Sequence, residues 1–280
     1  MTSDAPLTGP TPQVSIVERH ADIPRAQRIV VKVGSSSVTG DNVGQIDTLV
    51  DALAEAHARG SEVILVSSGA IASAKPFLGL EGNIRASGDL ATQQAAAAVG
   101  QNVLMWRYQT SLDRYRILAG QLLLTAGDME HPTNRSNARR AFERLLGLRV
   151  LPIVNENDTV ATQEIRFGDN DRLAALVSVL VQADVLVLLS DVDALYTRPP
   201  SDPGAVRVDH VAHDDELDQI AFGDIGEAGV GTGGAATKVA AAKLAAGHGI
   251  PVLLTETGSV ARALAGERLG TWFDAAPVAG

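Results

Sequence analysis

The chain has 280 residues, of which 45% are hydrophobic and 20% charged, with a formal net charge of −10 and no cysteine. This composition is ordinary for a globular protein with a large core, and the acidic balance argues against a surface that binds nucleic acid or an anionic membrane. The lack of cysteine excludes disulfides, thiol catalysis and thiolate metal sites, so a reducing cytoplasm is the simplest location.

Residues 1–27 contain four prolines and no apolar run, so we expect a disordered tail rather than an export signal. No linker or internal repeat divides the remainder, and we expect residues 28–280 to form a single domain. The apolar stretch Leu173–Leu189 is interrupted by Gln182 and Asp184, which favours a buried helix followed by a buried strand over a membrane span.

Short apolar, β-branched runs alternate with helical patterns along this remainder. The predicted strands are Ile29–Val33, Val63–Val66, Ile117–Leu124, Val150–Val154, Val185–Leu189 and Val252–Leu254. The predicted helices are Gln45–Arg59, Leu90–Asp113, Asn134–Leu146, Arg172–Gln182 and Lys238–Ala246. Runs that are apolar throughout indicate strands covered on both faces. The alternation therefore predicts an α/β fold with a mostly parallel sheet wrapped by helices.

Polar residues follow the predicted strands, at the sheet edge where parallel sheets bind ligands. The blocks are Lys32–Ser37, Ser67–Ala70, Asn155–Asp158, Gly168–Asp171 and Ser190–Asp193. Ordinary turn and N-cap chemistry could explain each block alone, and for Asp169 or Asn170 capping is the simpler interpretation. Lys32 differs because it lies in an apolar strand, where its ammonium group must reach solvent or a polar cleft. Its position at the strand end favours the cleft.

The run Gly229–Lys238, GVGTGGAATK, admits two phosphate-binding interpretations and one without a binding role, a flexible surface loop. A Walker A loop is excluded because Thr237 precedes Lys238. The dinucleotide pattern G-x-G-x-x-G is satisfied, with Glu256 at a suitable distance for a ribose-binding acid, but no apolar strand precedes the run. Since the run leads directly into a predicted helix, whose N-terminus favours anions, we predict a nucleotide-phosphate loop.

Together these segments supply two lysines, glycine-rich turns and several Asp and Asn side chains, which is what phosphoryl transfer requires. The six histidines are scattered, with no metal-ligand spacing and no serine–histidine arrangement. No general base stands out, which fits an acceptor that is already an anion, such as a carboxylate.

Seven segments carry a family resemblance: VVKVGSSSVTG, VSSGAIASA, AAVGQ, NENDTVAT, FGDNDRLAAL, LLSDVDALYT and GTGGAATK. In this order they resemble the amino-acid kinase family, and within it the glutamate 5-kinases, over roughly residues 28–274. The resemblance implies a three-layer α/β/α sandwich. It also implies transfer of the γ-phosphoryl group of MgATP to the side-chain carboxylate of L-glutamate, the first step of proline biosynthesis.

The resemblance also implies roles for individual residues. Lys32 and Lys238 are expected to neutralise the transferring phosphoryl group, and Asp171 to orient them. The expected glutamate-binding residues are Ser68, Asp158 and Asn170. The expected ATP-binding residues are Lys32, Ser190, Asp191, Thr232, Gly233, Gly234, Ala235, Ala236, Thr237 and Lys238. Mg²⁺ is expected to be held mainly by phosphates and water, with no protein ligand. A homo-oligomer and feedback inhibition by L-proline are further expectations.

The sequence departs from the family pattern in three places. Many glutamate 5-kinases continue into a PUA domain, which we expect to be absent because the chain ends shortly after Phe273. Thr92 stands where a lysine is expected, and Glu130–Ser136 also differs. We expect both departures to affect the region that governs glutamate affinity and proline feedback rather than the chemistry. A sister kinase acting on N-acetylglutamate, aspartate or UMP, an NAD-dependent oxidoreductase and a non-catalytic amino-acid sensor are the alternatives.

Overall fold

The computed structural model describes residues 17–80, 89–160, 170–215, 217 and 234–277. Their strands are β1 (Arg28–Val33), β2 (Glu62–Ser67), β3 (Ala119–Leu124), β4 (Leu151–Glu156), β5 (Val185–Ser190), β6 (Leu195–Tyr196), β7 (Arg207–Val208), β8 (His210–Val211), β9 (Val252–Glu256) and β10 (Thr271–Phe273). The α-helices are α1 (Gln45–Ala58), α2 (Ala70–Leu78), α3 (Leu90–Leu112), α4 (Ala126–Glu130), α5 (Pro132–Gly147), α6 (Asn170–Val181), α7 (Ala235–Gly247) and α8 (Val260–Leu264). Five short 3₁₀ helices, η1 to η5, connect them in the described ranges.

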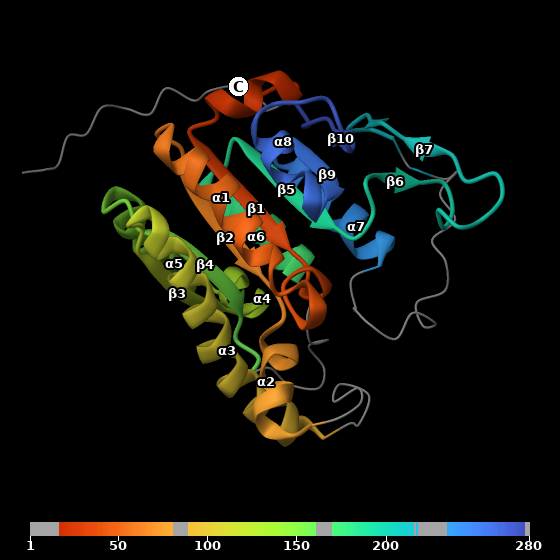
Figure 1. Cartoon of the computed structure of the whole chain (residues 1–280). Coiled ribbons are helices and arrows are strands. Elements are labelled where there is room, and N and C mark those ends of the chain that lie inside the picture. Colours follow the sequence, from red (N-terminus) through yellow and green to blue (C-terminus); the bar gives the residue numbers. More distant parts are fainter. Residues whose placement is uncertain (1–16, 81–88, 161–169, 216, 218–233, 278–280) are drawn as a thin grey trace, which may run out of the picture.

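Eight of the described strands form one sheet in the order β3-β4-β2-β1-β5-β9-β10-β8 (Figure 1). Neighbouring strands are parallel except β9 and β10, which are antiparallel, and β6 pairs with β7 in a separate two-stranded sheet. The central strands β1, β2, β4 and β5 are almost wholly buried, because their apolar runs are covered on both sides. The prediction of a mostly parallel α/β sheet is confirmed.

Two hydrophobic clusters lie on opposite faces of this sheet and make it the middle of three layers. One cluster joins Val31 and Leu65 to residues of α1, α3 and α8, such as Leu53. The other joins Val30 to residues of α5, α6 and α7, such as Val177. Because successive strand residues point to opposite faces, Val30 and Val31 enter different clusters. The α/β/α sandwich expected from the family resemblance is therefore present.

The expected boundary between a tail and the folded domain at residue 28 is wrong for the segment that the structure describes. Residues 17–27 pack onto the domain: Val17, Ile23 and Ala26 are buried, and η1 occupies His20–Arg25. The ring of His20 lies 4.8 Å from that of Trp272, centroid to centroid. Isolated apolar residues around a proline give no periodic pattern, which is why the sequence did not reveal this contact. Residues 1–16 lie outside the described residues.

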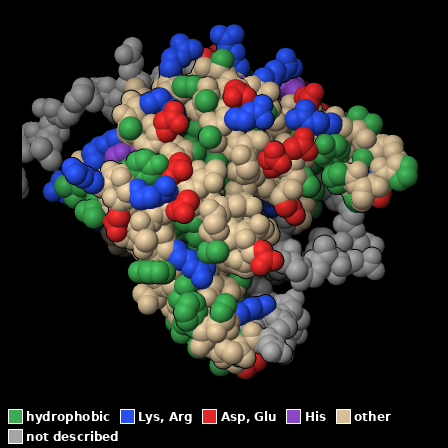
Figure 2. Space-filling view, viewed as in Figure 1, with side chains coloured by type: hydrophobic (Ala, Val, Ile, Leu, Met, Phe, Trp, Pro, Cys, Tyr) green, Lys and Arg blue, Asp and Glu red, His purple; other side chains and the backbone are tan. Residues whose placement is uncertain are grey.

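The chain also contains short elements that the sequence patterns did not predict, namely α2, α4, α8 and the short strands β6, β7, β8 and β10. Elements of two to nine residues are too short to show a clear period. No helix in the described ranges is both long and apolar enough to cross a membrane. Figure 2 shows that basic and acidic side chains are interspersed over the face viewed.

Candidate active site

The carboxyl ends of the parallel strands meet at one edge of the sheet and bring the polar blocks together. Lys32 of β1 is in register with Val66 of β2 on one side and with Leu188 of β5 on the other. Ser68, the residue after β2, and Ser190, the last residue of β5, therefore lie two positions beyond the residues paired with Lys32. Within β1, Lys32 alternates with Val31 and Val33, so its side chain points to the face that α6 and α7 cover.

A buried cluster of two lysines and one aspartate lies at this edge. Lys32 Nζ is 2.6 Å from Asp171 Oδ1, and Lys238 Nζ is 3.3 Å from Asp171 Oδ2. The three residues come from β1, α6 and α7, and all are buried, with Asp171 only 2% exposed. Two ammonium groups face one carboxylate, so one positive charge is in excess within the three residues. In an acidic chain, this is a local environment that favours an anion.

The pKa of Asp171 reports the balance of forces in the cluster. Burial by itself raises the pKa of this carboxyl group, but the charges of Lys32 and Lys238 and the hydrogen bonds from Lys32 and Thr237 outweigh burial. The net result is a pKa below the ordinary value of 3.8. Asp171 is therefore a carboxylate at neutral pH and holds both lysines.

Thr237 joins the cluster through the first turn of α7. Its Oγ1 donates to Asp171 Oδ2 at 2.8 Å, and it also lies 3.0 Å from the carbonyl oxygen of Gly234. Gly234 is the N-cap residue of α7 and, as a glycine, offers no side chain of its own to cap this end. The helix therefore presents the backbone N–H groups of its first turn beside Lys238, an arrangement that suits a phosphate. Thr232 and Gly233, expected in the same loop, lie outside the described residues.

Ser190 and Asp191 follow β5 at the same edge. Ser190 is buried, and its Oγ donates to Asp191 Oδ1 at 3.0 Å, while Asp191 is exposed. Thr257 Oγ1 donates to the carbonyl oxygen of Ser190 at 3.1 Å and lies 2.7 Å from Ser37 Oγ. These hydroxyl groups tie the ends of β1, β5 and β9 together at the carboxyl edge of the sheet.

Asn170 and Asp158, expected on the glutamate side, are both buried. Asn170 is the first residue of α6, and its Oδ1 has no hydrogen-bond partner in the part of the chain that the structure describes. An N-cap side chain would accept a backbone N–H, so capping does not account for Asn170. A buried amide oxygen without a partner is unfavourable, so Asn170 Oδ1 is a candidate to accept a hydrogen bond from a ligand. Asp169 and Gly168 lie outside the described residues.

Asp158 lines a cavity of about 320 Å³ beyond the end of β4. The cavity also contains Glu156, Gln101 and Gln121, with apolar walls from α3 and β3. Gln101 Oε1 accepts hydrogen bonds from Gln121 at 3.2 Å and from Asn155 at 3.3 Å. Three amide groups, those of the buried Gln101 and Asn155 and of the exposed Gln121, thus connect α3, β3 and β4 immediately before the loop that carries Asp158. This volume is at the lower end of the range for small-molecule sites.

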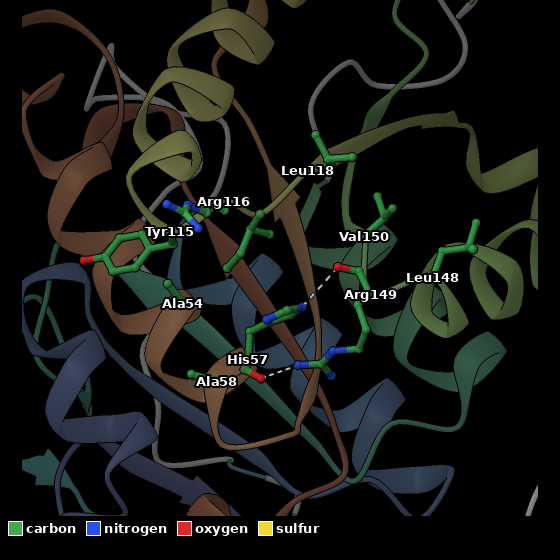
Figure 3. A pocket seen from close by; sticks show the side chains of 10 residues that line it. Ala54, His57, Ala58, Tyr115, Arg116, Leu118, Leu148, Arg149 and Val150 are labelled. Atoms are coloured by element: carbon green, nitrogen blue, oxygen red, sulfur yellow. Dashed lines mark hydrogen bonds between the residues drawn. The ribbon is translucent and has the colours of Figure 1, made fainter.

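A second cavity of about 330 Å³ lies at the opposite edge of the sheet, before β3 and β4 begin (Figure 3). His57 and Arg149 form part of its wall, and each contacts the other's backbone carbonyl oxygen. The pKa of His57 is lowered by burial and by the neighbouring charge of Arg149. None of the sequence-predicted site residues lines this cavity, so its chemistry is separate from that of the lysine cluster.

Of the two positions that depart from the family pattern, Glu130–Ser136 contacts the residue next to Asp171. Glu130–Ser136 spans the junction of α4 and α5, and Glu130 lies 3.7 Å from the guanidinium group of Arg172, the residue after Asp171. Thr92 lies in the first turn of α3, where its backbone N–H donates to Asp89 Oδ1 at 3.2 Å. Among the described residues, no group of three or more His, Asp or Glu side chains is arranged to hold a metal ion.

Comparison with known proteins agrees with this architecture. The model of the amino acid kinase family matches residues 27–256. Glutamate 5-kinase from Leifsonia xyli subsp. xyli is 66% identical over 257 residues, which are 92% of this chain and 94% of that protein. Glutamate 5-kinase from Clavibacter michiganensis subsp. michiganensis is 70% identical over 254 residues, 91% of this chain and 96% of that protein.

Among solved structures, carbamate kinase from Giardia lamblia bound to AMP-PNP superposes with a TM-score of 0.64. The match covers 90% of this chain and all of that one, and its 15% sequence identity makes it evidence for the fold alone. The family model and the highly identical relatives each span most of this chain. The chain therefore belongs to the amino-acid kinase family.

Proposed function

We propose that this chain transfers the γ-phosphoryl group of MgATP to the side-chain carboxylate of L-glutamate, giving L-glutamyl 5-phosphate and ADP. This chain covers nearly the whole length of highly identical relatives that are named glutamate 5-kinase. The observation in the structure that supports the chemistry best is the buried contact of two lysines with Asp171 at the carboxyl edge of the sheet. In this role the chain performs the first step of proline biosynthesis.

The lysine cluster supplies the electrostatics of the reaction. A γ-carboxylate oxygen of glutamate forms a bond to the γ-phosphorus while the bond from that phosphorus to the β–γ bridging oxygen breaks, and ADP leaves. The attacking carboxylate is already ionised, so the step requires no general base. Lys32 and Lys238 neutralise charge on the transferring group, and Asp171 holds both ammonium groups in place before the substrates bind. Preorganised charge in a buried site is the largest contribution expected here.

The two substrates approach the cluster from different sides of β1. On the glutamate side, Ser68, Asp158 and Asn170 contact the amino acid, with Asp158 facing the α-ammonium group and Asn170 offering its buried amide oxygen. On the nucleotide side, Ser190, Asp191 and the segment Gly234–Lys238 contact ATP, and the first turn of α7 faces its phosphates. Mg²⁺ arrives as part of the substrate and is held mainly by phosphates and water.

The family resemblance supports three further parts of the proposal: a homo-oligomeric assembly, a cytoplasmic location and feedback inhibition by L-proline. Proline and glutamate both carry an α-carboxylate and an α-nitrogen, so the inhibitor is placed in the glutamate site. The contact between Glu130 and Arg172 connects the segment Glu130–Ser136, which differs from the family pattern, with the residue next to Asp171. Regulation in this chain is therefore expected to differ in strength from that of relatives with the usual segment.

The test of the proposed function is ADP release by the purified chain with ATP, magnesium and a panel of acceptors. L-Glutamate should support turnover, whereas L-aspartate, N-acetylglutamate and UMP should not. Lys32→Ala, purified in the same way, controls for a contaminating ATPase and should release almost no ADP. Equal or faster turnover with another acceptor would show a sister kinase. Binding of glutamate without turnover would show a non-catalytic sensor.

A further inference from the structure

We propose that Tyr108 is a positioning residue for glutamate binding, acting through Ser67 on the substrate-binding segment that begins at Ser68. This inference rests on the proposed function, because it takes Ser68 as a glutamate contact. Tyr108 lies in the middle of α3 and comes from outside the sequence blocks that point to the site. It would touch no substrate itself.

The first observation is a continuous pair of buried hydrogen bonds. Tyr108 Oη lies 2.8 Å from Ser67 Oγ, and Ser67 Oγ donates to the carbonyl oxygen of Ser68 at 3.1 Å. A serine hydroxyl has a single hydrogen, so Tyr108 must be the donor of the first bond. The two hydrogen bonds thus point in one direction: Tyr108 donates to Ser67, and Ser67 donates to the Ser68 carbonyl group.

The Tyr108 hydroxyl group stays protonated and therefore remains a hydrogen-bond donor. The side chain of Tyr108 is fully buried in the cluster beneath α1 and α3, with an exposure of 0%. Burial raises the pKa of Tyr108 well above its ordinary value, with the hydrogen bond to Ser67 acting in the opposite direction. The phenol therefore keeps its proton at every pH at which the enzyme could work, and the packed ring leaves its hydroxyl group little freedom.

The second observation is that the segment after Ser68 is held from two sides. Gly69 has a φ of 98°, a conformation that other residues rarely adopt, and a Cβ there would lie 2.9 Å from Thr39 Cγ2. On the opposite side, Gly100 of α3 packs so closely that a Cβ would lie 1.7 Å from the carbonyl oxygen of Ala70. Helix α3 thus contacts this segment at Gly100 and, two turns later, at Tyr108.

These contacts fix the peptide group between Ser68 and Gly69. A planar peptide whose carbonyl oxygen is held by Ser67 has a defined orientation, and this orientation sets the direction of Ser68 and the start of α2. A site that must hold glutamate within a fraction of an ångström of the phosphoryl group benefits from such support. Removal of the Tyr108 hydroxyl should therefore weaken glutamate binding while leaving the lysine cluster and the nucleotide side intact.

The decisive variant is Tyr108→Phe, which keeps the ring and removes only the hydroxyl group. We expect the KM for glutamate to rise roughly three- to tenfold, the range that corresponds to one net hydrogen bond, with kcat and the KM for ATP changed less than about twofold. The matched control is Tyr115→Phe. Tyr115 is exposed and donates to Asp51 Oδ1 at 2.7 Å, so the same deletion there should leave both KM values unchanged.

A double-mutant cycle shows whether Tyr108 acts on glutamate binding through Ser67 or whether the two residues contribute independently. Ser67→Ala should raise the KM for glutamate as Tyr108→Phe does, and the double variant should be no worse than Ser67→Ala alone, because both act through the Ser68 carbonyl group. If Tyr108→Phe does not fold, the effect of Ser67→Ala on the two KM values decides the question.

Three results would overturn the inference. A lower melting temperature of Tyr108→Phe with an unchanged KM for glutamate would make the hydroxyl group purely structural. Additive effects in the cycle would show that Tyr108 does not act through Ser67. An equal rise in the KM for ATP would show a general disturbance of the site. Absence of glutamate-dependent turnover in the unmodified chain would instead contradict the proposed function, so the two failures are distinguishable.

Discussion

Replacing Asp171 by asparagine removes the negative charge between two buried lysines while it keeps the shape of the side chain. The carboxylate lies 2.6 Å from Lys32 Nζ and 3.3 Å from Lys238 Nζ, and it is 2% exposed. Removal of one partner of a buried ion pair typically destabilises a protein by about 3–5 kcal/mol. For a chain of this size, that corresponds to a melting temperature lower by roughly 6–20 °C.

Thermal unfolding at pH 7 measures the effect, with Asp51→Asn as the matched control. Asp51 also pairs with an arginine, since its Oδ1 lies 2.6 Å from Arg114 Nη2, but about half of its side chain is exposed. Its replacement should change the free energy of unfolding by at most about 1 kcal/mol. If Asp171→Asn and Asp51→Asn destabilised the chain equally, Asp171 would not hold the two lysines as we describe.

The same comparison has a pH dependence with a defined sign. The pKa of Asp171 in the folded chain is below 3.8, because the two lysines and the hydrogen bonds outweigh the effect of burial. A carboxyl group with a lowered pKa contributes stability above its unfolded pKa and loses it as the pH falls through the folded pKa. The difference between the unmodified chain and Asp171→Asn should be complete above about pH 4 and shrink below it. A difference that grew on acidification would refute the reasoning.

The remaining predictions concern the two halves of the site and its inhibitor. Lys238→Ala should lower kcat roughly 10²- to 10³-fold, as expected for loss of one preorganised electrostatic group; an intact kcat in steady-state kinetics would contradict this role. Asp158→Ala should raise the KM for glutamate roughly ten- to a hundredfold and leave the KM for ATP nearly unchanged, whereas a loop-stabilising role would disturb both KM values and lower the melting temperature. L-Proline should raise the apparent KM for glutamate more than it lowers kcat, and inhibition competitive only with ATP would exclude a shared pocket.

Much of the arrangement could be predicted from the sequence because long elements carry clear periodic signals. The apolar run around Lys32 indicated a strand, and the ammonium group of a lysine inside such a run must reach solvent or a polar cleft. The patterns of α1, α3 and α5 gave helix boundaries within about two residues of those in the structure. Strand-end blocks could then be placed at one edge, because the ends of parallel strands coincide.

Other features depend on contacts between distant parts of the chain and carry no local signal. Thr237 reads as one residue of a glycine-rich loop, and its hydrogen bond to Asp171 arises only when α6 and α7 pack side by side. Tyr108 reads as an ordinary core aromatic, although its hydroxyl group reaches Ser67. Gln101 lies in the quoted segment AAVGQ, yet only the fold shows that its amide contacts Asn155.

The most direct test of glutamate phosphorylation at the lysine cluster is chemical identification of the product. The purified chain, incubated with MgATP, L-glutamate and hydroxylamine, should give a hydroxamate at the γ-carboxyl group in an amount that matches the ADP released. Mass spectrometry with fragmentation distinguishes this product from an α-hydroxamate. Lys238→Ala should form it much more slowly while still binding both substrates. Glutamate-dependent ADP release without a γ-hydroxamate, or equal hydroxamate formation by Lys238→Ala, would contradict phosphoryl transfer to the γ-carboxylate at this site.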